Sequence, residues 1–193
     1  MTILVTGFEV FNGLERNPSW EAAKLLPPEI DGVKIEIAQI PVVFGEAGAA
    51  MDEHIRRTGA DAVLCVGVAV GRTAVTPELV AINYRTASIA DNSGRRITGE
   101  KINPALDAAY MTDMPIHDII DDIKAAGIPA ALSLSAGAYV CNDLYFHLLS
   151  LGRQGLFVHV PGEDAVSAED DARALTLCLR RMIHCMKGHT AEE

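Results

Sequence analysis

The chain has little of what marks several large classes of protein. Its 16 basic residues face 26 acidic ones, and the formal net charge of -10 disfavours nucleic acids and anionic membranes as partners. None of its four cysteines stands in CxxC spacing, so neither a zinc site nor a thioredoxin-type motif is supported. We therefore expect no nucleic acid, no membrane and no metal to be involved in its function.

Long apolar runs and a basic leader are also missing. The first residues, "MTILVTGFEV", lead directly into a strand pattern. We accordingly expect neither a signal peptide nor a transmembrane helix. The expected location is the cytoplasm, where a reducing environment keeps thiols free and allows one of them to be catalytic.

The composition that is present is that of an ordinary globular protein, with 49% hydrophobic and 22% charged residues in a chain of 193. This length fits one domain covering residues 1–193. The polar, turn-rich stretch near 82–105 predicts a hairpin-like excursion from that domain, and the end of the chain after 188 predicts a loose tail.

Short apolar runs alternate with amphipathic segments along the chain. The expected strands are residues 2–8, 33–42, 61–69, 79–85, 128–137 and 155–161. The expected helices are residues 17–26, 46–58, 116–126, 139–151 and 167–188, with Asn17 and Ser167 as N-caps and Gly59 and Gly127 as stops. This alternation predicts a three-layer α/β/α sandwich around a twisted, largely parallel central sheet.

Cys141 stands out because it follows a turn of small residues (135–138) at the start of a predicted helix. Functional groups of open α/β sheets gather at the carboxyl ends of strands. Free N–H groups and the positive end of the helix dipole there lower a thiol pKa and can bind an oxyanion. Position alone leaves two interpretations of Cys141 open, a nucleophile and an inert buried cysteine, and the second is the more common state of a free cysteine.

A nucleophilic cysteine needs a base and a group that orients the base. Of the six histidines, His159 is the candidate, because it ends a short apolar strand and Pro161 follows. A core histidine fits the same pattern. Glu78, just before an apolar strand, is the candidate third member, and a solvated turn residue is its alternative. Spacing alone does not establish that the three side chains meet.

Three motifs together resemble the pyroglutamyl peptidase I family, also called pyrrolidone-carboxylate peptidases. They are "VTGFEVFNG" with "NPSWEA", "CVGVAVGR" with "VTPELVAIN" and "ADNSG", and "SAGAYVCNDLYFHLL" with "FVHVP". The resemblance runs in register from about residue 3 to 161. It implies a phosphorylase/hydrolase-like fold and a cysteine exopeptidase that releases an N-terminal pyroglutamyl group from peptides, without a cofactor or metal, as a homo-oligomer, often a tetramer.

The resemblance also implies roles for individual residues. Glu78, Cys141 and His159 correspond to the catalytic triad. A second set corresponds to the pocket for the flat, neutral lactam ring: Phe8, Phe11, Asn17, Tyr139 and Val140. Phe8 and Phe11 fit ordinary core packing equally well.

Two positions depart from the family pattern. Val68 stands where the family commonly has glutamine, and Ser88 stands where it commonly has an arginine near the oxyanion site. Loss of one oxyanion donor costs about 10²–10³ in rate where it is used. Arg85 is a candidate substitute for the missing arginine.

Three alternatives to the leading interpretation follow. The first is a related cysteine amidase or peptidase with a shifted acyl-group specificity, which Val68 and Ser88 favour. The second is a non-catalytic binding protein on the same scaffold, against which the complete set of Glu78, Cys141 and His159 argues. The third is nucleotide binding through "GVAVGR", which lacks both GxGxxG and the Walker lysine.

Overall fold

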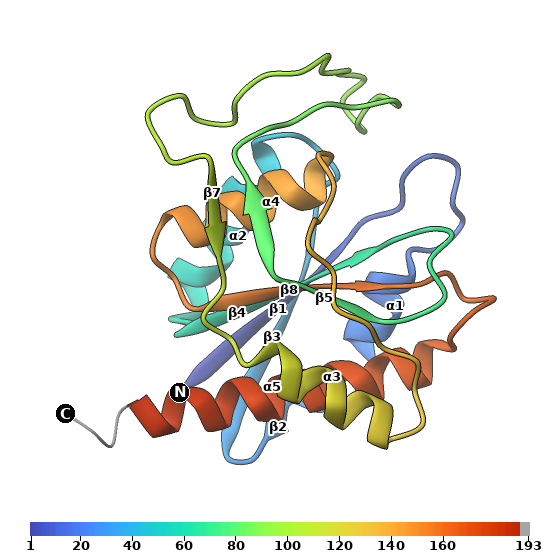
Figure 1. Ribbon diagram of the computed structural model, residues 1–193, viewed down its shortest axis with the longest axis vertical. Coiled ribbons are helices and arrows are strands. Elements are labelled where there is room, and N and C mark those ends of the chain that lie inside the picture. The colour runs from blue at the N-terminus through green and yellow to red at the C-terminus, as the bar shows by residue number, and fades with distance from the viewer. Residues whose placement is uncertain (190–193) are drawn as a thin grey trace.

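A central sheet with the strand order β2-β3-β1-β4-β8-β5 organises the computed structural model, which describes residues 1–189 (Figure 1). Its strands are β1 (Thr2–Phe8), β2 (Glu29–Ile30), β3 (Val33–Ile40), β4 (Ala62–Val68), β5 (Thr76–Glu78) and β8 (Gly155–Val160). A separate antiparallel ribbon joins β6 (Val80–Ile82) to β7 (Ala109–Met111). The helices are α1 (Pro18–Lys24), α2 (Glu46–Thr58), α3 (Ile116–Ala125), α4 (Val140–Ser150) and α5 (Ala168–His189).

The four inner strands β3, β1, β4 and β8 are parallel, and the short edge strands β2 and β5 are antiparallel to their neighbours. β1, β4 and β8 are almost wholly buried, as expected for parallel strands that are covered on both faces. The predicted α/β fold with a largely parallel sheet is confirmed.

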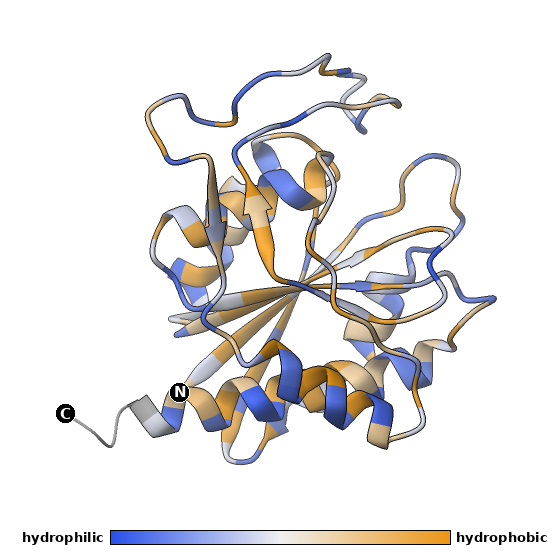
Figure 2. Cartoon of the chain, viewed as in Figure 1, coloured by the Kyte–Doolittle hydropathy of each residue, from blue (hydrophilic) through white to orange (hydrophobic). Residues whose placement is uncertain are grey.

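Two apolar clusters lie on the opposite faces of this sheet. One joins the sheet to α1, α3 and α5, and the other joins it to α2 and α4. Figure 2 shows the strands coloured mostly as hydrophobic and the helices as two-sided. The helices therefore form one layer on each face, and the start of α4 lies close to the carboxyl ends of the strands.

Local capping explains where several helices begin and end. The Asn17 side chain accepts a hydrogen bond from the Ser19 N–H at 3.1 Å, with Pro18 in the first turn. Gly59 ends α2 in the left-handed conformation, with φ of 67°. The Ser167 hydroxyl accepts from the Asp170 N–H at 3.2 Å at the start of α5. These predicted caps are confirmed.

The predicted strand at 128–137 does not form as a continuous strand. Its first half makes two parallel bridges, at Ala130 and Ser133, and four backbone hydrogen bonds to residues 75–79. Pro129 has no N–H to give to a ladder. The Ser133 hydroxyl instead donates to the Ser135 carbonyl, and the Ser135 hydroxyl accepts from the Gly137 N–H. Local side-chain bonds thus replace strand pairing only in the second half of the segment, between Ser133 and α4.

The predicted strand at 79–85 is shorter than expected and belongs to the β6–β7 ribbon, outside the central sheet. Between β6 and β7 a long loop projects beyond the sheet (Figure 1). Within it, Arg85 and Glu100 exchange two backbone hydrogen bonds. The single domain with an excursion near 82–105 stays a prediction. The predicted tail after 188 concerns mainly residues 190–193, which lie outside the described residues.

No helix within the described residues 1–189 has the length and apolar character needed to cross a membrane.

Candidate active site

The carboxyl edge of the sheet brings together pieces that are far apart in sequence. His159, near the end of β8, is in register with Gly67 of β4 on one side and with Thr76 of β5 on the other. Glu78 ends β5, and Cys141 is the second residue of α4. The topology thus places His159 and the start of α4 at the carboxyl edge, as expected for open α/β sheets. Because β5 is antiparallel to β8, Glu78 is in register with Phe157, further from that edge than His159.

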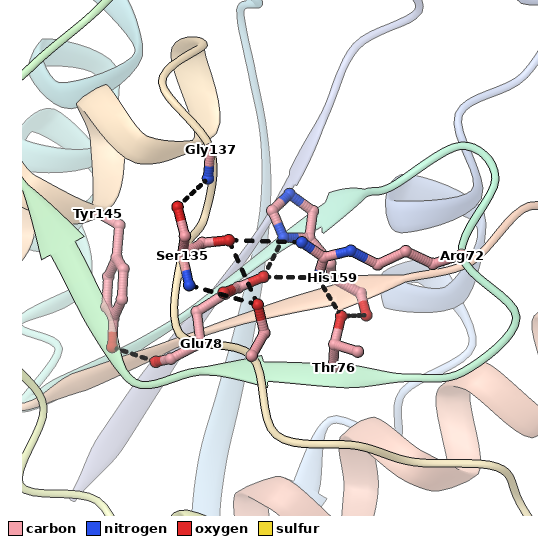
Figure 3. A network of polar contacts seen from close by, with 8 residues as sticks. Arg72, Thr76, Glu78, Ser135, Gly137, Tyr145 and His159 are labelled. Carbon is pink, nitrogen blue, oxygen red and sulfur yellow. Dashed lines mark hydrogen bonds and ion pairs between the residues drawn. The ribbon is translucent and has the colours of Figure 1, made fainter.

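His159 and Glu78 form a buried pair, drawn in Figure 3. The Nδ1 atom of His159 lies 2.7 Å from Oε1 of Glu78, and the two side chains are 5% and 0% exposed. An ionised carboxylate only accepts hydrogen bonds, so Nδ1 carries the proton and Nε2 keeps its lone pair. Burial lowers the pKa of His159, although the hydrogen bond to Glu78 opposes that shift. The imidazole is therefore neutral at pH 7 and able to act as a base at Nε2.

Cys141 lies at the start of α4, whose N-cap residue Tyr139 makes no side-chain cap. Its side chain is half-buried. Burial, followed by the negative charge of Glu78, raises the pKa of the Cys141 thiol to about 12. The expectation of a thiol made more acidic by the helix start is therefore wrong for the resting protein, because burial and the charge of Glu78 raise its pKa. A protonated thiol needs a base before it can attack.

A cavity of about 620 Å³ opens at this edge of the sheet. Its walls are mostly apolar and include both Cys141 and His159. Gly67 leaves the room for the thiol, because a Cβ atom there would lie 3.1 Å from the Cys141 Sγ and 2.8 Å from the ring of Phe157. The sulfur and the imidazole consequently share one accessible space.

The predicted lactam-binding residues surround Cys141. Together with it they line a small hollow of about 20 Å³ next to the main cavity: Phe8, Phe11, Asn17, Tyr139 and Val140. Phe8 and Val140 are almost completely buried and also belong to the core. The Tyr139 ring packs edge-on against Phe44, and its hydroxyl donates to the Ala90 carbonyl at 3.0 Å.

Asn17 has both ends of its amide occupied. The oxygen accepts from Ser19, and the nitrogen donates to the Glu9 carbonyl at 2.8 Å. It is 2% exposed. Asn17 therefore holds the "GFEVFN" loop against α1, and through that loop it fixes Phe8 and Phe11 next to Cys141.

Both departures from the family pattern, Val68 and Ser88, lie in the wall of the main cavity. Arg85 does not replace the absent arginine. Its guanidinium pairs with Glu100 at 2.8 Å and with Asp143 at 3.1 Å, and Arg85 is not among the residues lining the cavity. That candidate role is wrong because two carboxylates already hold the side chain.

Sequence reasoning missed Arg72 as a member of this site. Its Nη1 atom lies 2.7 Å from Oε1 of Glu78 and 2.5 Å from Oγ1 of Thr76. Arg72 ends the segment "GVAVGR", which belongs to one of the three family motifs, but the motif alone assigns no role to its arginine. Within the described residues, no group of three His, Cys, Asp or Glu side chains is arranged to hold a metal ion.

Comparison with known proteins decides the family. A model described as "Pyroglutamyl peptidase" matches residues 1–190. The chain belongs to the pyroglutamyl peptidase family. Membership confirms the resemblance noted in the sequence and makes the chain a cysteine peptidase of this class.

Individual relatives agree with this assignment. A pyrrolidone-carboxylate peptidase of Thermosipho melanesiensis is 44% identical over 167 residues, which is 83% of each chain. The crystal structure of pyroglutamyl peptidase I from Bacillus amyloliquefaciens superposes with a TM-score of 0.88 at 38% identity, covering 94% of both chains. The pyrrolidone carboxyl peptidase of Thermococcus litoralis has a TM-score of 0.92 at 27% identity, covering 97% of this chain and 96% of the other.

Proposed function

We propose that this family member releases N-terminal pyroglutamyl groups from peptides with Cys141 as nucleophile, His159 as general base and acid, and Glu78 as the group that orients His159. The observation that supports this assignment is the His159–Glu78 pair at 2.7 Å, whose imidazole lines the same cavity as the half-buried Cys141. Base, orienting carboxylate and nucleophile are the parts that covalent acyl transfer needs.

The first half of the reaction forms a thioester. Cys141 attacks the carbonyl carbon that joins the pyroglutamyl ring to the next residue, and its S–H proton passes to Nε2 of His159. The C–N bond then breaks, and the His159 imidazolium protonates the leaving amine. Backbone N–H groups in the first turn of α4 are the donors for the oxyanion, since no Tyr139 side-chain cap competes for them. The second half is the attack of water, deprotonated by His159, on the thioester, which frees pyroglutamate and restores the thiol.

The pocket walls suit the substrate. A lactam is neutral and flat, and the main cavity of about 620 Å³ beside Cys141 has room for it and offers the aromatic rings of Phe11 and Tyr139. The part of the peptide that follows the pyroglutamyl residue can extend away from the Cys141 sulfur through a second cavity. This cavity of about 340 Å³ shares Leu14, Val68 and Val70 with the main one and continues toward residues 162–164.

A shifted acyl-group specificity is the second candidate function. It is favoured by Val68 and Ser88 in the cavity wall, which offer fewer polar contacts than the glutamine and arginine common in the family. An acyl group less polar than a lactam would be the better substrate in that case.

We extend the proposal to the oligomeric state of the protein and its location in the cell. A homo-oligomer, a tetramer by family resemblance, in the cytoplasm is the form in which we expect the enzyme to act. Light scattering on the eluting peak of a sizing column measures the mass directly, and a monomer at working concentration would contradict the assembly.

The test of function compares a chromogenic pyroglutamyl amide with its prolyl counterpart. The prolyl ring has a charged amine in place of the lactam amide, so an apolar pocket should reject it. We expect thiol-dependent hydrolysis of the pyroglutamyl amide and none of the prolyl amide. Faster turnover of another N-blocked amide supports the shifted specificity, and no turnover of any of them contradicts a peptidase.

A further inference from the structure

Arg72 connects three parts of the candidate site. It lies in the loop between β4 and β5, and its Nη1 atom donates to Oε1 of Glu78 at 2.7 Å and to Oγ1 of Thr76 at 2.5 Å. Its Nη2 atom lies 3.4 Å from the carbonyl oxygen of Ser135, in the turn before α4 (Figure 3). One guanidinium thus contacts the strand that carries Glu78 and the segment that leads to Cys141.

Glu78 depends on this cation because of where it lies. Its side chain is 0% exposed, while that of Arg72 is 34% exposed. Oε1 receives both His159 and Arg72, and Oε2 has no hydrogen-bond partner among the described residues. A buried carboxylate without a counter-charge favours its neutral form. Among the described residues, Glu78 has two ion-pair partners, Arg72 and His159. Of these, only Arg72 carries a positive charge at every working pH.

The charge of Glu78 in turn decides which nitrogen of His159 is free. A carboxylate accepts from Nδ1 and leaves the Nε2 lone pair for the proton of Cys141. A neutral carboxyl group can donate to Nδ1 instead, which puts the ring proton on Nε2. In that tautomer the nitrogen facing the cavity no longer accepts a proton, and the thiol has no base.

We propose that Arg72 is a positioning residue of the hydrolytic site, which acts through Glu78 to keep the His159 Nε2 atom unprotonated and holds the turn before Cys141 through the Ser135 carbonyl. This inference rests on the proposed roles of Cys141, His159 and Glu78. Arg72 itself is not among the residues that line the cavity.

The charged and titratable groups around His159 give the inference a pH signature. They come from the β4–β5 loop, β5, α4 and β4: Arg72, Glu78, Cys141, Tyr145 and Cys65. The positive charge of Arg72 lowers the pKa of His159, while Glu78 raises it. In the proposed mechanism removal of Arg72 neutralises Glu78, and the influence of Glu78 on the pKa of His159 is larger than that of Arg72. The acid limb of kcat/KM should therefore move to lower pH, in addition to the slowing of the reaction.

The experiment compares Arg72→Lys, which keeps the charge, with Arg72→Gln, which keeps a neutral donor, and Arg72→Met, which keeps neither. The control is Arg173→Met on α5, since Arg173 also pairs with a carboxylate, Asp170, and contacts a backbone carbonyl. Hydrolysis of the chromogenic pyroglutamyl amide is measured against pH. Imidazole ¹⁵N NMR of each protein reports the tautomer and titration of His159 without any substrate.

We expect Arg72→Met to lower kcat about 10²-fold, as removal of a preorganised electrostatic group does, with KM within about twofold. The acid limb and the NMR titration of His159 move to lower pH in Arg72→Gln and Arg72→Met, and stay near the wild-type position in Arg72→Lys. Arg173→Met matches the wild type throughout. Should Arg72→Met fail to fold, the Lys and Gln variants decide the question between them.

Unchanged acid limbs and an unchanged His159 tautomer in both Arg72→Gln and Arg72→Met would overturn the inference, whatever their stability. The inference would also be overturned if the acid limb and the His159 titration of Arg72→Lys shifted as far as those of Arg72→Gln. If the wild type does not hydrolyse the amide while the NMR shifts appear as expected, the proposed function fails and the role of Arg72 stands.

Discussion

Cys141 and Cys178 have thiols of similar acidity in two different regions of the molecule. Burial is the largest cause in both cases and raises the pKa of each to about 12. Cys178 lies within α5, wholly enclosed in the apolar cluster on one face of the sheet. Cys141 opens α4 on the other face and lines a cavity together with His159. The two cysteines therefore differ in their access to the cavity and in the presence of a neighbouring base. They do not differ in the pKa of the resting thiol.

Glu78 and Asp171 extend the comparison to carboxylates, since both are almost completely buried. Glu78 accepts from His159 and Arg72, whereas neither carboxylate oxygen of Asp171 has a hydrogen-bond partner among the described residues. Burial, then the charge of Asp170, raises the pKa of Asp171 to about 8. The same chemical group is hydrogen-bonded and paired with a cation in one region and has no hydrogen-bond partner for its carboxylate oxygens in the other.

The largest effect should come from substituting the two compared cysteines, Cys141 and Cys178, one at a time. Cys141→Ser should lower hydrolysis of the pyroglutamyl amide by about 10⁴-fold or more, as loss of a nucleophile does in triad enzymes. Cys178→Ser should leave kcat within about twofold, because that thiol contacts only the core. Steady-state rates with active-site titration measure both. Comparable losses in the two variants would remove the distinction drawn between these cysteines.

The second effect concerns Glu78. Glu78→Gln keeps the shape but removes the charge, and we expect kcat to fall about 10³–10⁴-fold with little change in KM. Because Glu78 raises the pKa of His159, the acid limb of the residual activity should move to lower pH, in the same direction as in the neutral Arg72 variants. The exposed Glu53 on α2 supplies the control, Glu53→Gln. A wild-type pH profile in Glu78→Gln would contradict the proposed role.

The third effect is the pH dependence of the resting thiol. With a pKa raised to about 12, Cys141 is protonated at neutral pH, so its thiolate fraction grows with every pH unit up to that value. Alkylation of Cys141 by iodoacetamide, followed by peptide mass spectrometry, should rise about 10²-fold over two pH units above 7. A rate that has already reached its plateau at pH 6 would instead indicate a preformed thiolate–imidazolium pair.

The smallest effect is on stability and comes from Asp171. A raised pKa means that the folded state prefers the neutral carboxyl group. Stability from this preference is fully present below the ordinary value of 3.8 and is lost as the pH rises through about 8. Asp171→Asn keeps a neutral group at every pH. Its melting temperature should therefore match the wild type near pH 4 and exceed it by about 2–4 °C at pH 8, the shift expected for about 1 kcal/mol.

Thermal melts at both pH values measure this difference, with Asp121→Asn on the exposed side of α3 as the control. A gain at pH 4 as large as that at pH 8 would mean that the carboxylate charge of Asp171 is not the cause.

Much of the fold could be predicted from local signals. The continuous apolar runs of β1, β4 and β8 identify covered parallel strands, and Asn17, Gly59 and Ser167 cap helices through short-range geometry. The topology rule also places Cys141 and His159 at the same sheet edge. Their chemical roles, like that of Glu78, stay predictions.

The rest depends on contacts that no local pattern contains. The acidity of Cys141 follows from its burial and from Glu78 in another element, so the helix start alone gave the wrong direction. Residues 128–137 have a strand composition, and their first half forms backbone hydrogen bonds to residues 75–79. The serine side chains of the second half bind locally, so no continuous strand forms. Arg72 is six residues from Glu78 and belongs to the site only because β5 turns back along β8.

The central claim, that Cys141 carries the acyl group, is tested most directly by trapping the intermediate. The wild-type protein is mixed with a pyroglutamyl amide, quenched in acid within the first turnover, digested and mapped by mass spectrometry. The account predicts a pyroglutamyl thioester on the peptide that contains Cys141 and on none that contains Cys65, Cys178 or Cys185. An adduct on another residue, or turnover by Cys141→Ser at the wild-type rate, would contradict it.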